Sequence, residues 1–367
     1  MHGIRQQRGS VRGSDSAMSA RALVVATHRI GEAVMAQPLL ALLRQRDRTL
    51  RIDALCPPRT AAVFRAMPEV GEVLEAPDSV GRLSGTAAFV RLGWQLRARG
   101  YQRAYLLSGE PGPALSALIA GIPERIGHSR PGQRRLLNRL HEPSGAGALP
   151  LAAHYAQLAF APGEPLPGDV RAPRLMRCAR RERSVRTRFG LGDTGPLILL
   201  CPGAEHGLAR RWPTRHYAAL ASLLCDAWPE AELVVLGSAR ERATATEIAA
   251  LSGQPVRNLA GATAIDEAIA IVSQAGAVVT GDSGMMHLAA AYGRPQVAVF
   301  GATDPRHTAP RSPRARVEWL HLPCSPCFGH DCPLGQPDCL HLIAPAVVLD
   351  SLSKAMRFEA AGIRPVR

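Results

Sequence analysis

The residues best suited to chemistry lie in Val278–Pro295, where an apolar run stops at the turn Gly281–Gly284 and an alanine-rich helical pattern begins at once. This pattern predicts a strand that enters a helix through small residues. The first amides of such a helix have no partner within it and lie at the positive end of its dipole, so they can hold a phosphate without a metal. Asp282, at the end of the strand, could accept hydrogen bonds from sugar hydroxyls beside that phosphate. The pair indicates a nucleotide-sugar site, although an ordinary turn with Ser283 as helix N-cap would leave the same pattern.

A second candidate loop, Thr27–Glu32, directly follows the first apolar run of the chain and opens a helical pattern. Gly31 would let a ligand approach the backbone, and a carboxylate at the start of a helix is favoured by the helix dipole. Glu32 could therefore be a helix-capping acid and nothing more. If it faces a cleft, it is the natural general base for deprotonating an acceptor hydroxyl.

A third candidate loop, Cys201–Glu205, follows an apolar run in the second half of the chain and leads to Arg210 and Arg211. A guanidinium offers two parallel hydrogen bonds to phosphate oxygens and keeps its charge, so either arginine could clamp a diphosphate. Because Trp212-Pro213 starts a helix directly afterwards, we expect Arg210 to point inward and Arg211 outward.

Four cysteines near the end of the chain, spaced C-x2-C-x4-C-x6-C, form a further cluster: Cys324, Cys327, Cys332 and Cys339. Close-set thiols can wrap a tetrahedral zinc ion, and His330 or His341 could replace one ligand. The first pair brackets a proline and the run is compact, so free thiols or a redox pair stay equally open. A zinc ion here would stiffen the loop rather than take part in a reaction.

The composition is that of a two-domain α/β protein. The chain has 367 residues, of which 46% are hydrophobic and 4% aromatic, which is enough for two full cores. No apolar run approaches the ~18 residues of a membrane span. Residues 1–18 are rich in Arg, Gly and Ser without an apolar segment, so we expect a disordered extension and no signal peptide. We therefore expect a cytoplasmic protein with thiols or metal ligands in place of disulfides.

The net charge of +14 is confined to the first half of the chain. Residues 1–190 contain 29 arginines against 14 acidic residues, whereas residues 191–367 contain 15 basic and 16 acidic residues. Such an excess would attract an anionic partner, unless it is only a solvated arginine-rich surface. Aromatic residues are scarce and nucleic-acid-binding motifs are missing, so we expect no nucleic acid. An acidic substrate at a membrane surface fits better and would make the protein peripheral on the inner membrane.

Short apolar runs alternate with helical patterns in both halves, which predicts parallel sheets covered by helices. The strands predicted in the first half are Ala22–Ala26, Ile52–Cys56, Val73–Ala76 and Ala104–Leu107, and the helices are Glu32–Arg46, Thr60–Met67 and Leu83–Arg99. The strands predicted in the second half are Pro196–Pro202, Glu232–Gly237, Val256–Leu259, Ala277–Thr280 and Val297–Gly301, and the helices are Thr214–Trp228, Ala239–Leu251 and Ala264–Gln274.

These elements predict two Rossmann-like domains, residues 19–185 and 190–345, which face each other across a cleft at the carboxyl ends of their strands. The domains should join within Arg177–Phe189 or the glycine-containing turn Gly190–Gly195, where the periodicity lapses. The three candidate loops would then meet in the cleft.

Several motifs in combination resemble the lipopolysaccharide heptosyltransferases of glycosyltransferase family nine, most of all the branch that adds the second inner-core heptose. They are the glycine-acid turn Gly31–Glu32, PGAEHGLARRWP from Pro202, TGDSGMMHLAAAYGRPQVAVFGATDPRHTAP from Thr280, and CSPCFGHDCPLGQPDC from Cys324. The likeness covers roughly residues 20–350. It implies a GT-B fold with an amino-terminal acceptor domain, a carboxyl-terminal donor domain, and a last helix within 346–367 that crosses back to the first domain.

The resemblance also implies the reaction and the site. Heptose would move from ADP-heptose, with inversion, to an acidic acceptor of lipid A, Kdo and heptose. The donor residues carried over by position are the amides of Ser283, Gly284 and Met285 for the diphosphate, Asp282 for the heptose hydroxyls, His287 for a phosphate or the ribose, Arg210 for phosphate, and Glu205 on a loop that touches the donor. No D-x-D motif lies in a suitable loop, so we expect no required cofactor or divalent ion.

Two positions depart from the family pattern. The family usually has Asp after the glycine of the first loop, and this chain has Glu32, which is one methylene longer; small displacements at a reacting centre are costly. The loop Ser108–Gly112 has no basic residue for the acceptor, where a related enzyme more often has one. Two other functions therefore stay open, a sugar-nucleotide epimerase or hydrolase, and a nucleotide-sugar-binding protein with a degenerate active site.

Overall fold

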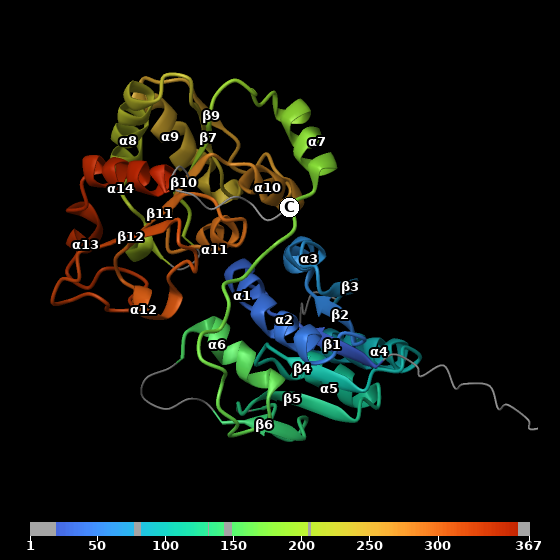
Figure 1. Ribbon diagram of the computed structural model, residues 1–367. Coiled ribbons are helices and arrows are strands. Elements are labelled where there is room, and N and C mark those ends of the chain that lie inside the picture. The colour runs from blue at the N-terminus through green and yellow to red at the C-terminus, as the bar shows by residue number, and fades with distance from the viewer. Residues whose placement is uncertain (1–19, 77–81, 131, 143–148, 205–206, 359–367) are drawn as a thin grey trace, which may run out of the picture.

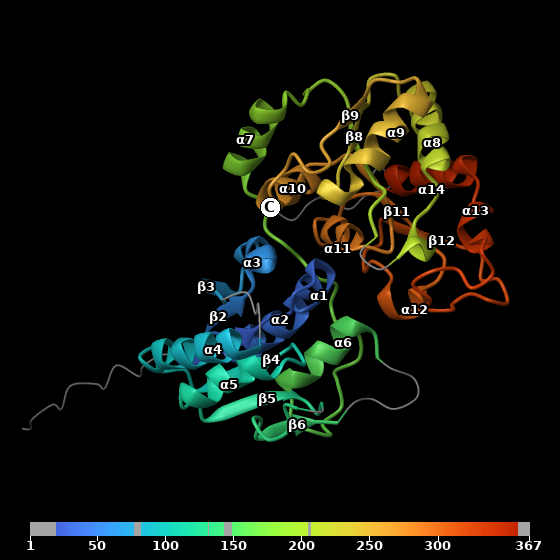
Figure 2. The ribbon, with the colours of Figure 1, turned by 180° about the vertical axis from the view of Figure 1, so that it is seen from behind.

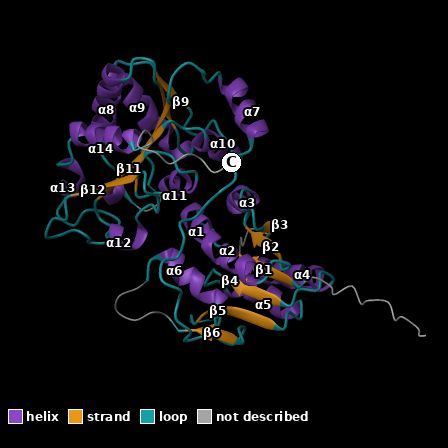
Figure 3. Ribbon diagram, viewed as in Figure 1, coloured by secondary structure: helices purple, strands orange, loops and turns teal. Residues whose placement is uncertain are grey.

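The computed structural model describes residues 20–76, 82–130, 132–142, 149–204 and 207–358, which form two α/β domains one above the other (Figure 1). In both domains helices flank a central sheet (Figure 3). The predicted α/β fold with two Rossmann-like domains is confirmed.

The first domain contains six strands and six α-helices. The strands are β1 (Arg21–Val25), β2 (Arg51–Cys56), β3 (Val70–Glu75), β4 (Arg103–Leu106), β5 (Glu124–His128) and β6 (Arg139–His141). The helices are α1 (Ile30–Met35), α2 (Gln37–Arg46), α3 (Pro58–Arg65), α4 (Arg82–Arg97), α5 (Pro111–Ile119) and α6 (Leu151–Ala156), which continues into the 3-10 helix η1 (Gln157–Ala159). All strand pairs are parallel, in the order β3-β2-β1-β4-β5-β6.

The second domain repeats this plan. Its strands are β7 (Leu197–Cys201), β8 (Glu232–Val235), β9 (Val256–Asn258), β10 (Ala277–Gly281), β11 (Gln296–Phe300) and β12 (Ala315–Trp319). Its helices are α7 (Ala179–Phe189), α8 (Thr214–Ala227), α9 (Arg242–Ser252), α10 (Ile265–Ser273), α11 (Gly284–Ala291), α12 (Pro305–Thr308), α13 (Asp338–His341) and α14 (Pro345–Arg357), with 3-10 helices η2 (Leu208–Arg210) and η3 (Ala239–Glu241). The parallel strand order is β12-β11-β10-β7-β8-β9.

Both sheets change direction at the same place in their strand order. In each, the first strand lies between the second and the fourth, so β1 pairs with β4 and β7 pairs with β10. Parallel α/β sheets bind ligands beside such a switch point, outside the carboxyl ends of the strands. The loops after β1, β4, β7 and β10 are therefore the ones positioned for binding.

One apolar core runs through both domains. Val24 in β1, Val34 in α1, Leu288 in α11 and Val278 in β10 are fully buried members of the same cluster. Burying a side chain of this kind contributes ~1.5–3 kcal/mol. A separate cluster fills the opposite face of the first sheet, beneath α4 and α5. The face of the first sheet that bears α1 is thus the one that meets the second domain.

The nine strands predicted from sequence are present, and β5, β6 and β12 were missed because each is short and includes charged residues. The predicted helix Glu32–Arg46 is two helices, α1 and α2, which meet at Ala36. Pro38 lies in the first turn of α2, and because proline has no amide hydrogen it is favoured at the start of a helix and disfavoured inside one.

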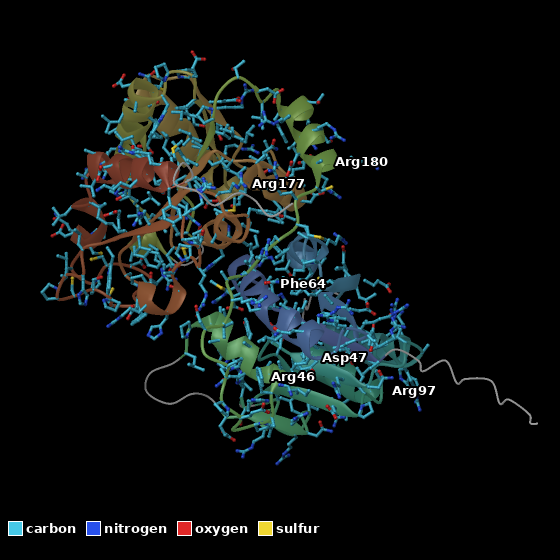
Figure 4. All side chains as sticks on the ribbon, viewed as in Figure 1. Arg46, Asp47, Phe64, Arg97, Arg177 and Arg180 are labelled. Carbon is cyan, nitrogen blue, oxygen red and sulfur yellow. The ribbon has the colours of Figure 1, made fainter. Side chains whose placement is uncertain are left out.

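The domain boundary lies earlier than predicted. Leu175 donates its amide to Ala291 of the second domain and Met176 donates to Ala66 of the first, so the chain crosses between the domains here. α7 then packs on α10, where Arg181 pairs with Asp266. Figure 4 shows Arg177 and Arg180 at this crossing. α7 therefore belongs to the second domain, because its partners lie there.

The predicted return of the last helix to the first domain is not seen in the described residues. α14 packs on α8, β10, β11 and β12 of its own domain, where Val348 and Leu352 are fully buried. The apolar stripe of the helix matches the nearest sheet, which explains this placement. Residues 359–367, like the predicted extension 1–18, lie outside the described part of the chain.

Candidate active site at the domain junction

The first turns of α1 and α11 touch each other at the junction of the two domains, and both views of the ribbon show the helices side by side (Figures 1 and 2). A Cβ added to Gly31 would lie 2.6 Å from Cδ2 of His287 and 3.6 Å from Cα of Gly284. A Cβ added to Gly284 would lie 3.0 Å from Cβ of Ile30. Glycine is required on both helices for this approach. The loop after β1 and the loop after β10 therefore share one junction, as the sequence predicts.

Glu32 is the third residue of α1 and stands at this junction with 28% of its side chain exposed. Arg29 donates from Nη1 to Glu32 Oε1 at 3.3 Å. The negative charge of Glu32 also acts on the hydroxyl of buried Tyr155 in α6. A carboxylate that is paired with a surface arginine and still open to solvent can accept a proton from a bound hydroxyl.

The turn before α11 has the geometry of a capped helix start. Ser283 is the N-cap in extended conformation, and its Oγ accepts a 3.3 Å hydrogen bond from the Met285 amide. Thr280 Oγ1 lies 2.9 Å from Ser283 Oγ. The cap reading and the phosphate reading are compatible, because the amides of Ser283 and Gly284 precede the first hydrogen bond within the helix. These amides lie at the positive end of the α11 dipole.

Arg210 lies beside this helix start, as the sequence predicts. Its Nη1 is 3.4 Å from Oδ2 of Asp282, with 21% and 12% of the two side chains exposed. A Cβ at Gly281 would lie 3.2 Å from the Arg210 carbonyl oxygen, so the loop crosses directly over the end of β10. A guanidinium and a row of backbone amides thus face the same position after β10.

Arg211 does not point freely outward, contrary to the sequence prediction. Its Nη2 lies 3.6 Å from Oε1 of Glu241, and 32% of its side chain is exposed. Glu241 also caps η3 in a reciprocal capping box with Ser238, and its Cδ would be 3.1 Å from a Cβ at Gly203. The spacing Ser-x-x-Glu at 238–241 is the sequence signal that could have revealed this contact.

His287 lies in the contact between α1 and α11. Its ring packs against Gly31, only 7% of the residue is exposed, and its Nδ1 has no hydrogen-bond partner among the described residues. Burial lowers the pKa of His287 to about 4. The imidazole is therefore neutral at pH 7, and the contribution to the donor expected of it is not supported by its position here.

Glu205 lies outside the described residues. The other predicted junction residues come together on α1 and α11 and on the loop between β7 and α8, namely Gly31, Glu32, Arg210, Asp282, Ser283, Gly284 and Met285. The geometry brings the Glu32 carboxylate to the same junction as the paired Arg210 and Asp282 and the backbone amides at the start of α11.

A second ionic contact lies at the same edge of the first sheet. His28 Nε2, after β1, is 3.0 Å from Glu110 Oε2, after β4. A cavity of about 140 Å3 extends along the junction from Met35 and Leu151 in the first domain to Arg306 and Arg311 in the second. Glu110 was not recognised from sequence because its partner, His28, is far away in the chain. Arg306 pairs with Asp304, the N-cap residue of its own helix, and was not singled out either.

The four late cysteines line a single cavity of about 410 Å3 in the second domain, together with Ala209 of the Arg210 loop. Burial first and then the neighbouring thiols raise the pKa of Cys339 to about 11. Among the described residues, no group of three or more His, Cys, Asp or Glu side chains is arranged to hold a metal ion. A zinc site here stays a prediction.

Comparison with known proteins assigns the family. The model of "Glycosyltransferase family 9 (heptosyltransferase)" matches residues 89–337. The chain is 34% identical to lipopolysaccharide heptosyltransferase 2 of Escherichia coli over 348 residues, which is 92% of this chain and 99% of the relative. It is equally identical to lipopolysaccharide heptosyltransferase 2 of Salmonella typhimurium over 346 residues, again 92% and 99%.

Solved structures agree with this result. The structure of E. coli ADP-heptose lipopolysaccharide heptosyltransferase II matches with a TM-score of 0.82 and 32% identity, over 93% of this chain and 100% of the other. A family 9 glycosyltransferase from Veillonella parvula matches with a TM-score of 0.79 at 18% identity, over 92% and 97%, and so supports the fold alone. Within the described residues, every helix is too short or too polar to cross a membrane. These relatives do not favour an epimerase, a hydrolase or a degenerate binding protein, and the chain belongs to glycosyltransferase family 9, the heptosyltransferases.

Proposed function

We propose that this enzyme transfers heptose from ADP-heptose to the inner core of lipopolysaccharide, with inversion and without a metal ion. The observation that supports this most directly is the contact between α1 and α11, because it brings Glu32 and the amides before α11 to one junction. The names of two relatives, lipopolysaccharide heptosyltransferase 2 and ADP-heptose lipopolysaccharide heptosyltransferase II, support ADP-heptose as the donor and lipopolysaccharide as the acceptor.

In the proposed reaction, the acceptor oxygen attacks the anomeric carbon of the heptose as the bond to the diphosphate breaks. Glu32 takes the proton of the attacking hydroxyl, and ADP leaves with the electron pair of the broken bond. General-base catalysis of this kind contributes ~10²–10⁴-fold to a rate. The exposed fraction of Glu32 and its position in the first turn of α1 leave its carboxylate open to such a hydroxyl.

Negative charge accumulates on the leaving diphosphate, and positive groups in fixed positions stabilise that charge. We assign this role to the amides of Ser283 and Gly284 and to the guanidinium of Arg210. Preorganised groups of this kind need no rearrangement during the reaction. Asp282 holds Arg210 in place through their ion pair and accepts hydrogen bonds from the heptose hydroxyls. Because these groups supply the positive charge, the reaction does not depend on a divalent ion.

The acceptor would be an acidic oligosaccharide on lipid A, presented at the cytoplasmic surface of the inner membrane. The arginine excess of residues 1–190 supports an anionic acceptor on the first domain. The protein would then act as a peripheral enzyme.

The test is heptose transfer from ADP-heptose to core-truncated lipopolysaccharide by the wild type and by Glu32→Gln. We expect the substitution to lower kcat by ~10²–10⁴-fold, because the amide cannot accept the proton. ADP affinity, measured by calorimetry, should stay within about twofold, since the diphosphate site lies on the other helix. Glu32→Asp should keep more activity than Glu32→Gln, because aspartate retains the carboxylate and only changes its position.

Glu124→Gln is the matched control. Glu124 is the first residue of β5 and lies at the amino ends of the strands, away from the junction. Its side chain is 42% exposed and pairs with Arg103. This variant should retain wild-type kcat and KM. Wild-type activity in Glu32→Gln, or full loss of transfer on addition of EDTA, would contradict the proposed mechanism.

A further inference from the structure

The acceptor side of the junction contains an arginine, Arg130, although the loop after β4 on that side has no basic residue. The strands β1, β4 and β5 are neighbours, so the loops that follow them lie side by side at the carboxyl edge of the first sheet. The loop after β4, Ser108–Gly112, has no basic residue. The loop after β5 begins with Ser129 and Arg130 and ends where β6 begins.

Gln133 fixes the loop after β5 onto the loop after β4. Its side chain is almost fully buried, with 1% of the residue exposed. Nε2 donates to the carbonyl oxygens of Ser108 at 2.7 Å and of Glu110 at 2.6 Å. Two short hydrogen bonds from one buried amide give the two loops a defined relative position.

This attachment places the side chain of Arg130 directly on Gly109. A Cβ at Gly109 would lie 2.9 Å from Cδ of Arg130 and 3.1 Å from its Nη1. Gly109 thus leaves room for the arginine, and any larger residue would displace it. Arg130 is exposed, and its side chain makes no hydrogen bond or ion pair within the described part of the chain.

Arg130 lies on the same side of the junction as the proposed base. The charges of Glu32 and of Arg130 both act on the buried hydroxyl of Tyr155, whose pKa is raised chiefly by burial. Arg130 also contributes, after burial, to the lowered pKa of His154, which stacks on His128 with ring centroids 3.5 Å apart. Because burial lowers the pKa values of His128 and His154 to about 3 and about 4, both rings are neutral at pH 7 and Arg130 is charged beside them.

Two hydroxyls at this edge also lack partners. Thr27 after β1 is 4% exposed and Ser108 after β4 is 9% exposed, and neither side-chain oxygen has a hydrogen-bond partner among the described residues. Buried polar groups without partners are uncommon, and a bound ligand is one way to satisfy them.

We propose that Arg130 binds the anionic group of the acceptor, a carboxylate or a phosphate, next to the sugar whose hydroxyl attacks. This inference rests on the proposed function and assigns the acceptor side of it. A guanidinium forms parallel charge-assisted hydrogen bonds with either anion and selects against a neutral sugar.

The test is calorimetric binding of a deacylated, anionic core oligosaccharide to the wild type and to Arg130→Gln, with steady-state transfer as the second readout. We expect the substitution to weaken oligosaccharide binding and to raise the acceptor KM by ~10- to 100-fold, as for loss of charged hydrogen bonds. The KM for ADP-heptose should be unchanged and kcat should stay within about threefold. The oligosaccharide affinity and acceptor KM of Arg130→Lys should be intermediate, because lysine keeps the positive charge but cannot form the two parallel hydrogen bonds of a guanidinium.

The matched control is Arg91→Gln, which removes the same charge from the exposed surface of α4, on the other face of the sheet. Its acceptor affinity should equal that of the wild type, as should the unfolding midpoints of all variants. Phosphatase-treated and carboxyl-reduced oligosaccharides identify the anion, because the one that lacks it should bind both proteins equally weakly.

Equal binding of the untreated oligosaccharide by the wild type and Arg130→Gln would overturn the assignment, as would an equal rise in the KM of the donor. Failure of the proposed function looks different. The wild type would then bind the oligosaccharide in an Arg130-dependent way and yet transfer no heptose to it.

Discussion

Both domains direct the carboxyl ends of their parallel strands to the junction, but the groups that follow the strands differ between the two domains. On the second domain, the positive groups are backbone amides before α11 and Arg210, which is already paired with Asp282. On the first domain, the working groups are side chains from separate loops, namely Glu32 after β1 and Arg130 after β5. The site on the second domain is built mainly on one helix start, whereas the site on the first domain combines residues that are far apart in the sequence.

This difference reflects what each side would hold. A diphosphate has a fixed shape and charge, so a rigid helix start and one compensated arginine suit it. An acceptor oligosaccharide varies in its sugars and anions, and loops that follow a rigid sheet can vary with it without disturbing the fold. The comparison therefore predicts separable effects of variants on the two sides.

The largest expected effect in this comparison is that of Arg210→Gln. The change removes a cation from the leaving group and also removes the ion pair of Asp282 with Arg210, so the negative charge of Asp282 repels the diphosphate more strongly. We expect kcat to fall by ~10²–10³-fold and ADP affinity to fall as well. Oligosaccharide binding, measured by calorimetry, should be unchanged, which would sharpen the distinction between the sides.

Adding Asp282→Asn to Arg210→Gln should recover part of the ADP affinity, because the negative charge beside the diphosphate is then removed. If Arg210→Gln bound ADP as the wild type does, the donor side would not be the cationic site described here.

A smaller effect is expected where the two sides meet. Gly31→Ala would place a methyl group 2.6 Å from the buried ring of His287, so α1 and α11 must shift apart. Overpacking of this kind costs ~1–3 kcal/mol, and the displacement of Glu32 should lower kcat by about tenfold. Thermal unfolding and transfer assays measure the two effects.

Gly168→Ala is the control for this change, since Gly168 has open space where the methyl group would be. It should alter neither property. Wild-type stability and rate in Gly31→Ala would show that contact between the helices does not set the position of the base.

The smallest effect concerns stability at low pH. Burial lowers the pKa of His287 to about 4, against an ordinary value of about 6.5. Between these values the unfolded chain binds the proton and the folded chain does not, so the free energy of unfolding falls as the pH is lowered from 6.5 towards 4. His287→Gln should reduce the loss between pH 6.5 and pH 5 by about 2 kcal/mol.

Denaturant titrations across this pH range measure that slope. His128 and His154, whose pKa values burial lowers to about 3 and about 4, would maintain the remaining dependence on the acceptor side. A pH profile unchanged by His287→Gln would show that the histidine is not buried at the junction.

The donor side was predictable because its signal is contiguous in the sequence. The fully buried strand β10, the turn at Gly281 and the helix after Ser283 follow one another within about fifteen residues. Two such signals at strand ends predicted that the loops of Arg210 and Asp282 meet in the cleft, although the ion pair between the two side chains was not predicted.

The acceptor side was only partly predictable. Glu32 follows its strand directly, but β5 is short and polar, so the loop that contains Arg130 and Gln133 had no recognisable position. The role expected of His287 stays a prediction, and its packing against α1 was not predicted, for a related reason. The sequence does not show which surface of α11 faces α1, and the contact of His287 with Gly31 is made only when the domains pack.

The close approach of Gly31 and Gly284 has a mechanical consequence. Two helices that meet backbone to backbone can rotate about the meeting point while their separation stays the same. The point lies next to the proposed base and the proposed phosphate cradle, so a rocking motion of one domain on the other would change the entrance for substrates far more than the distance between the reacting groups. The glycine pair would then serve as a fulcrum.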